Sequence, residues 1–198
     1  FGYWAVSHEF YKQLADDIPQ PWSLNIDAQA KTGTAEGVAL SKISSEKNTL
    51  TFSVTAQSLP SLPSPGNSEL PPQLAAQRDT LVVTNLTPGN YTLTVDGVAV
   101  TTAKHSDWAN GVPIDSSPAH REAEALRASI NDKNLQFTYS WKALNQVHIV
   151  GERKKSPSGR ALPAEVIEFD KLAKKREAEL SHKTGTPRKR QWQLAPAN

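Results

Sequence analysis

The chain of 198 residues contains no cysteine and no methionine. Without cysteine it cannot form a disulfide, a thiolate zinc site, an iron–sulfur cluster or a thiol nucleophile. Because methionine is missing even at the first position, we expect a processed chain or a piece of a longer one. No run of about 18 apolar residues occurs, so the sequence predicts no membrane-spanning helix.

Net charge and apolar content are both low. The 22 Lys and Arg residues nearly balance the 20 Asp and Glu residues, which leaves a formal net charge of +2. This balance argues against a protein that binds nucleic acid in bulk. Apolar residues make up 37% of the chain, below the ~45–50% that is usual for globular domains. We therefore expect a small core and either one domain or two small ones.

Residues 1–14 are predicted to form a helix that is apolar on two faces. One stripe at helical spacing contains Phe1, Trp4, Ala5, His8 and Tyr11, and the other contains Tyr3, Val6, Phe10 and Leu14. Such a helix is normally buried inside a larger body, and here no N-cap residue precedes it. The alternative is a frayed helix that docks on its own domain. We expect a core element separated from a missing partner.

Residues 23–116 are predicted to form a β-rich accessory module. Apolar and polar side chains alternate over residues 50–55 and again over residues 91–95, which is the period of a half-buried strand. Asp96-Gly97 indicates a tight hairpin, because a type I′ turn needs positive φ at both central residues. Five prolines within residues 58–72 predict an extended loop or an internal linker. Shorter strands are expected at residues 38–40, 81–83 and 98–100.

Residues 117–198 are predicted to form a helical C-terminal extension with a flexible basic tail. Ser116 or Ser117 as cap and Pro118 as the first helical residue begin a helix. Its narrow apolar stripe consists of Ala119, Ala123, Leu126 and Ile130. Residues 131–150 carry fewer helix signals, and alternation at Leu135, Phe137 and Tyr139 predicts an extended interruption there.

A second break is expected at Ser156–Gly159. A charged helix should then run from about Pro163 or Asp170 to Leu180. Its predicted inward side consists of Phe169, Leu172, Ala173, Arg176 and Leu180. From Thr184 onward the chain should be loosely held. The whole pattern predicts an α+β fold with an N-terminal helix, a small antiparallel β-sandwich-like module and C-terminal helices.

Two tripeptides contain the residue types of a catalytic triad. They are Ser7-His8-Glu9 and His105-Ser106-Asp107. Adjacent residues cannot form a triad, because they splay ~100° apart on a helix and point to opposite faces of a strand. No Gly-x-Ser-x-Gly elbow, Gly-rich phosphate loop or His-Glu-x-x-His helix occurs. The five histidines are not paired at metal-ligand spacing. The sequence therefore predicts no catalytic residue, no metal site and no cofactor.

Several charged and aromatic residues have both a functional and a structural interpretation. Arg188-Lys189-Arg190 could contact phosphates, but it lies in the predicted flexible tail. Glu122 and Glu124 lie two residues apart on a helix, and we expect solvated surface charges there. Trp141 and Trp192 could stack on a sugar or a base, although tryptophan more often anchors packing.

The opening segment Phe1–Tyr11 resembles the closing helix of SGNH/GDSL-type hydrolases, which follows their Asp-x-x-His block. Later segments resemble the C-terminal extension of SGNH-type esterases of the planctomycete-like kind. They are residues 85–97 and 107–112, then Lys133-Asn134, Phe137, Trp141, Asn145, Gly151, Arg153-Lys154 and residues 169–172. The family usually has Trp-Arg-Pro where this chain has Trp141-Lys142-Ala143, so no arginine role transfers to this position.

The resemblance implies a parent ester hydrolase, of the carbohydrate- or lipid-esterase kind, that uses Ser, His and Asp. Those residues would precede Phe1, so residues 1–22 would be the closing helix of a truncated hydrolase domain. The rest would be a non-catalytic C-terminal region that packs on this missing N-terminal domain and shapes its cleft. Trp141 and Asn145 would lie near substrate, and the family implies an extracellular or periplasmic location.

Two other functions stay open at the level of sequence. The first is an independent carbohydrate-binding β-sandwich, which would need Trp and Tyr side chains along one exposed face. The second is a structural or interaction protein whose charged C-terminal helix docks on a partner.

Overall fold

The computed structural model describes residues 21–60, 62, 78–143, 157–184 and 187–197, and near the start Val6, Phe10 and Gln13 alone. The predicted N-terminal helix and most of the proline-rich segment therefore lie outside the described residues. What is described belongs to two compact units. One comprises the residues up to Ala123 together with those from Thr186 on, and the other runs from Glu124 to Gly185.

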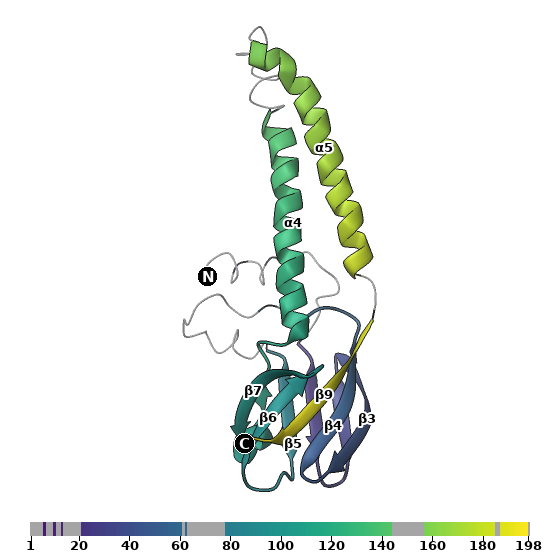
Figure 1. The fold of residues 1–198 in the computed structure, drawn as a ribbon, viewed down its shortest axis with the longest axis vertical. Coiled ribbons are helices and arrows are strands. Elements are labelled where there is room, and N and C mark those ends of the chain that lie inside the picture. Colours follow the sequence, from purple (N-terminus) through teal and green to yellow (C-terminus); the bar gives the residue numbers. More distant parts are fainter. Residues whose placement is uncertain are drawn as a thin grey trace. The chain divides into compact units, whose positions relative to one another are not determined.

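The first unit is built from two β-sheets (Figure 1). One sheet has the order β2-β1-β5-β8, formed by Thr32–Glu36, Ser23–Asp27, Thr80–Thr84 and Val112–Pro113. The other has the order β3-β4-β9-β6-β7, formed by Val38–Glu46, Thr49–Ala56, Arg188–Pro196, Asn90–Val95 and Val98–Lys104. A short helix, α3 (His105–Asn110), follows β7.

The two sheets enclose the hydrophobic core of this unit. The inward residues of β4 and β6 alternate as the sequence predicts: Phe52 and Leu93 are fully buried. Buried side chains of β1 and β5 belong to the same cluster as those of β4, β6 and β9, so the sheets pack face to face. The sandwich-like module is confirmed. The pair β1–β5 is parallel, which makes the first sheet mixed.

The Asp96-Gly97 turn between β6 and β7 has the predicted geometry. Both residues have positive φ, 50° for Asp96 and 78° for Gly97, and Val95 pairs directly with Val98. These angles are typical of the type I′ turn, whose twist matches that of the adjoining strands.

The prediction of a flexible basic tail is wrong. Residues 188–196 form β9, which pairs with β4 on one side and with β6 on the other (Figure 1). Trp192 lies opposite Phe52 in the neighbouring strand, and the two rings stack with centroids 5.7 Å apart. Leu194 is fully buried. The end of the described chain is therefore a central strand of the larger sheet.

The second unit is a pair of antiparallel helices. Helix α4 (Pro118–Ala143) begins in the first unit and continues into the second, and α5 is Pro157–Thr184. Arg176 Nε donates to Asp132 Oδ2 at 2.8 Å, and Lys133 Nζ donates to Glu177 Oε2 at 2.6 Å. The Tyr139 and Phe169 rings lie 5.4 Å apart. Residue numbers therefore rise along α4 where they fall along α5, so the two helices run antiparallel.

Three helix predictions for this unit are corrected. The expected interruption after residue 130 is absent over 131–143, because α4 continues to Ala143. The expected break at Ser156–Gly159 instead contains the start of α5 at Pro157, where proline fits the first helical turn. Of the predicted inward side of α5, Ala173 and Leu180 are buried, whereas Leu172 is 40% exposed.

The fold class is α+β, as predicted. Over the part of the chain that the structure describes, no helix combines enough length with enough apolar character to cross a bilayer.

Candidate functional site

The sequence-predicted site residues fall at the edge of the described part of the chain. Trp141 lies in the last turn of α4, and Asn145 falls outside the described residues. His105, Ser106 and Asp107 form the first turn of α3, and no triad forms among them. His105 Nδ1 accepts the Gly89 N–H at 3.3 Å, and Asp107 Oδ2 accepts the Lys104 N–H at 3.4 Å.

Aromatic side chains of the β-module serve mainly as packing anchors. Trp108 is fully buried, and Trp192 is 5% exposed. Trp192 stacks on Phe52 and meets Trp22 edge-on with ring centroids 5.6 Å apart. In the described part of the module we find no row of exposed Trp and Tyr side chains, so the carbohydrate-binding alternative gains no support.

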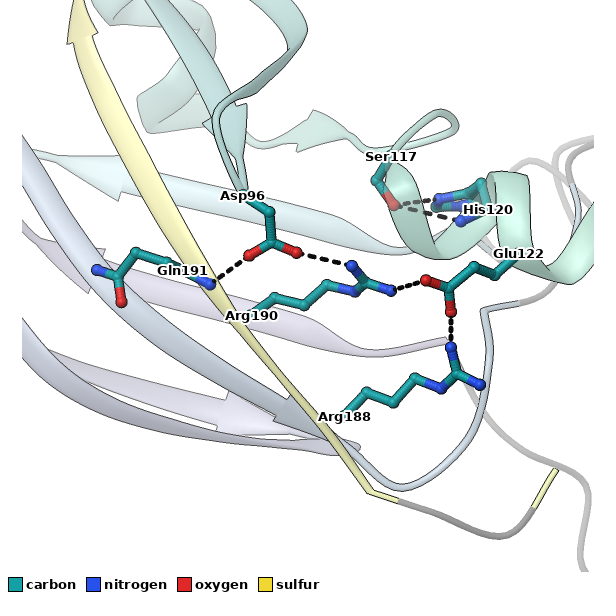
Figure 2. Close-up of polar contacts among 7 residues, drawn as sticks. All are labelled: Asp96, Ser117, His120, Glu122, Arg188, Arg190 and Gln191. Carbon is teal, nitrogen blue, oxygen red and sulfur yellow. Dashed lines mark hydrogen bonds and ion pairs between the residues drawn. The ribbon is translucent and has the colours of Figure 1, made fainter. Parts of the chain in front are cut away.

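A buried polar cluster that the sequence did not predict joins helix α4 to the first sheet. Ser117 caps α4: its Oγ accepts the His120 N–H at 3.4 Å and lies 2.9 Å from His120 Nδ1 (Figure 2). On the other side of the ring, His120 Nε2 lies 4.0 Å from Asp79 Oδ2. Asp79 Oδ1 accepts the Trp22 N–H at 3.1 Å. The side chains of Ser117, His120 and Asp79 form this cluster, and each residue is less than 10% exposed.

Burial decides the protonation of this cluster. It raises the pKa of Asp79 to about 7, against the lowering effect of the Trp22 hydrogen bonds. It also lowers the pKa of His120 to about 4. Between these values both side chains are uncharged, which is the state that a buried pair without a direct hydrogen bond favours.

The cluster contains Ser, His and Asp but is not built for nucleophilic catalysis. A serine nucleophile must reach the substrate, whereas Ser117 is 3% exposed and already caps a helix. The 4.0 Å separation of His120 and Asp79 is too long for the hydrogen bond that orients a catalytic histidine. The arrangement therefore anchors the start of α4 on the β-module.

A chain of ion pairs beside this cluster fastens α4 to β9. Arg190 lies between two carboxylates: Nη1 is 2.7 Å from Asp96 Oδ2, and Nη2 is 2.5 Å from Glu122 Oε1 (Figure 2). Arg188 contacts the other oxygen of Glu122. Glu122 is thus not the solvated surface charge that the sequence predicts. The arginines that could have met phosphates are held by carboxylates of the same unit.

A small cavity of about 40 Å³ lies between these groups. Its wall includes Trp22, Trp192, Ser117, His120, Arg188 and Arg190. A volume of this size holds a few water molecules and no sugar ring or drug-sized ligand. Trp192 Nε1 is buried and has no hydrogen-bond partner within the described structure, so a water there would satisfy it.

The described residues provide no set of metal ligands. No three His, Asp or Glu side chains of the described ranges gather closely enough to hold an ion.

Sequence reasoning found the Ser117 cap but missed Asp79, His120 and the Glu122 contacts. Asp79 precedes His120 by 41 positions, and Glu122 precedes Arg188 by 66. No local spacing signals contacts of this range. An aspartate just before a strand does not by itself indicate a buried polar cluster, because Asp is also common in loops.

Comparisons with known proteins give a fold likeness. No protein-family model and no curated protein matches the chain. Among solved structures it is similar to BT4096, a gut microbial diltiazem-metabolizing enzyme, with a TM-score of 0.66 and 18% sequence identity. The likeness covers 98% of this chain and 53% of that chain, so this chain spans about half the length of that enzyme. At this identity the likeness shows a shared fold.

Proposed function

We propose that the chain is the non-catalytic C-terminal region of an SGNH/GDSL-type ester hydrolase. The hydrolase domain would precede Phe1 and hold the Ser, His and Asp residues, and this chain would pack on it and shape its cleft. The observation that supports the proposal most is the fold likeness to roughly half of a longer enzyme. Asp107 and Ser117 are consistent with it, because their side chains accept backbone N–H groups at the starts of helices.

The parent activity in this proposal is the hydrolysis of esters, including carbohydrate esters, outside the cytoplasm. The enzyme whose structure the fold resembles metabolizes diltiazem, so the proposal includes esters of small drug-like molecules among the parent's substrates. Trp141 and Asn145 are proposed to lie near the cleft. Trp141 lies in the last turn of α4, and Asn145 follows four positions later.

An esterase assay on this chain tests the proposal that it has no catalytic residues of its own. With p-nitrophenyl acetate we expect the same background rate for the chain and for its S117A and S106A variants. A rate above background that disappears in either variant would contradict the proposal.

The residues that precede Phe1 in the natural polypeptide give the second test. The proposal requires an Asp-x-x-His block just upstream and a serine that reacts with a fluorophosphonate probe. A natural polypeptide with neither feature overturns the proposed function whatever the outcome of the first assay.

A further inference from the structure

A cavity of about 470 Å³ lies at one end of the β-module. The strands β1, β3 and β5 finish at this end, and the cavity wall includes residues of the loops that follow them. Asp79 and Trp22 lie at the opposite end, just before β5 and β1 begin. The volume is within the ~300–1,000 Å³ of small-molecule pockets, and loops at the end of a β-sandwich commonly carry binding sites. We call it the loop cavity.

The lining of the loop cavity is neutral. Among the described residues, none that lines it is charged. Its buried members include Leu50 and Tyr91, which are 1% and 2% exposed. Its exposed members include Gln29, Asn48 and Asn85. Because a charged ligand would leave water without meeting an opposite charge there, this lining favours an uncharged ligand.

Three polar side chains of the lining keep their hydrogen-bonding groups free. Within the part of the chain that the structure describes, the side chains of Gln29, Ser45 and Asn48 have no hydrogen-bond partner. Each amide offers two N–H donors and a carbonyl acceptor, and the serine hydroxyl both donates and accepts. A ligand that matches these groups must itself donate and accept hydrogen bonds at several neighbouring points.

Hydrogen bonds around the cavity fix its loops before a ligand arrives. Asn85 Nδ2 donates to Asp27 Oδ2 at 2.8 Å, and Asp27 Oδ1 accepts the Gln29 N–H at 2.9 Å. These two contacts join the loop after β1 to the loop after β5. The Tyr91 hydroxyl donates to the Thr87 carbonyl at 3.1 Å, which ties the second loop to β6. Because the lining is already held in place, binding a ligand costs little ordering of the loops.

We propose that the loop cavity binds a neutral saccharide through one sugar unit. A sugar ring carries adjacent hydroxyl groups that donate and accept, bears no charge, and has C–H groups that pack on apolar side chains, as this lining requires. Rows of exposed aromatic rings serve sites that stack along an extended glycan, whereas a cavity for one unit relies on hydrogen bonds. The inference goes beyond the proposed function, because it concerns the β-module alone and needs no hydrolase domain.

Nuclear magnetic resonance of the full chain tests the site. The ¹⁵N-labelled chain is titrated with cellotriose, xylotriose, mannotriose and triacetylchitotriose, each to ~10 mM, at which even millimolar affinity is visible. We expect at least one trisaccharide to shift the side-chain amide signals of Gln29, Asn48 and Asn85. The signal of Gln193, which lies on β9 and does not line the cavity, should stay unchanged.

A double variant removes two of these amides and preserves the fold. Q29A deletes an exposed side chain that has no hydrogen-bond partner in the described structure, and N48G suits the positive φ of 64° at that position. We expect Q29A/N48G to unfold at nearly the same urea concentration as the wild type and to bind the trisaccharide about tenfold more weakly or worse. Q193A, which removes an exposed amide of β9, is the matched control and should bind as the wild type does.

Four outcomes overturn the inference. In the first, no trisaccharide shifts the three amide signals, and in the second, the double variant binds as tightly as the wild type. In the third, only trigalacturonate, added as a charged probe, shifts the signals. In the fourth, the signals shift with protein concentration alone, which means that a second copy fills the cavity. The proposed function is tested on the residues before Phe1, so neither result decides the other.

Discussion

At the scale of single residues, Asp79 and His120 give the first unit an unusual response to pH. The folded-state pKa of Asp79, about 7, lies above its unfolded value of 3.8, so the stability from its neutral form declines as pH rises through that range. The folded-state pKa of His120, about 4, lies below its unfolded value of 6.5, so its contribution is lost as pH falls toward 4. Between pH 4 and 6.5 the two slopes oppose each other.

The first prediction separates the two slopes. We expect the free energy of unfolding of the wild-type chain to be nearly flat from pH 4.5 to 6.5. In D79N it should rise with pH by up to ~1.4 kcal/mol per pH unit, and in H120N it should fall at a similar rate. Urea unfolding at four pH values between 4.5 and 7.5 measures this.

The same series has a second readout. At pH 7.5 or above, D79N should be more stable than the wild type by about 2–4 kcal/mol, because Asn keeps the acceptor for the Trp22 N–H without a buried charge. Parallel pH profiles for all three proteins would show that the pair does not titrate as its burial implies.

Glu122 carries the second prediction. Its two oxygens bind Arg188 and Arg190, and the Arg190 side chain is 15% exposed. Removing the carboxylate in E122A leaves Arg190 with Asp96 as its ion-pair partner in the described structure. We expect a loss of about 1–2 kcal/mol in unfolding free energy. In E124A, which removes an exposed pair with Arg127, stability should not change measurably. Equal effects of the two variants would show that the Glu122 contacts are ordinary surface pairs.

At the scale of elements, β9 decides whether the larger sheet exists. Its neighbours β4 and β6 do not pair with each other, and both pair with β9. Without it, the backbone of two inner strands and the buried faces of Phe52 and Leu93 would meet water.

The third prediction follows from that position. Deleting residues 188–198 should prevent the first unit from folding, with loss of near-ultraviolet circular dichroism and of cooperative unfolding. The milder variant W192A should fold with a loss of about 3–5 kcal/mol, because it empties the space beside Phe52 and Trp22. As a control, K189A, on an exposed position of the same strand, should be near neutral. A folded deletion variant would contradict the central role of β9.

These elements also show how far the sequence could predict the fold. The strands β4 and β6 were predictable, because each buries three alternating apolar residues, and the β6–β7 turn was predictable from Asp96-Gly97. The strand β9 was not, because Arg188, Lys189 and Arg190 fill a third of it and the partners of the two arginines, Glu122 and Asp96, lie far away in the sequence. The alternation of apolar and polar residues over 135–139 is typical of a strand and led to the wrong prediction, although Leu135 and Tyr139 also fit one side of a helix.

The candidate site shows the same limit. The Ser117 cap depends on residues three positions apart, and it was visible in the sequence. The Asp79–His120 pair depends on packing between a strand and a helix, and it was not. Trp108, which belongs to a segment that carries the family resemblance, is a fully buried anchor whose Nε1 donates to the Tyr91 carbonyl at 3.4 Å. The match to the family at Trp108 therefore reflects packing of the hydrophobic core.

At the scale of the whole molecule, the helical unit is an insertion within the β-sandwich. The chain leaves the first unit in α4 and returns to it just before β9. Glu122, near the point of exit, contacts Arg188 and Arg190, near the point of return. The two points therefore lie close together, as expected of an element added to a sandwich that could close without it.

The fourth prediction is that the helical unit can be excised. Replacing residues 124–185 by a flexible Gly/Ser linker of about eight residues, which spans ~16 Å, should leave the first unit folded. The Ser117 cap, His120, Glu122 and β9 all stay in place, so we expect cooperative unfolding with a free energy within about 1–2 kcal/mol of the full chain, since loop length enters the free energy only logarithmically. Near-ultraviolet circular dichroism of the buried Trp108 and Trp192, followed through urea unfolding, is the measurement. The variant that lacks residues 188–198 is the unfolded reference. If the excised variant resembles that reference, the helical unit is required for the sandwich to fold, and it could not serve as a separable surface for a neighbouring domain.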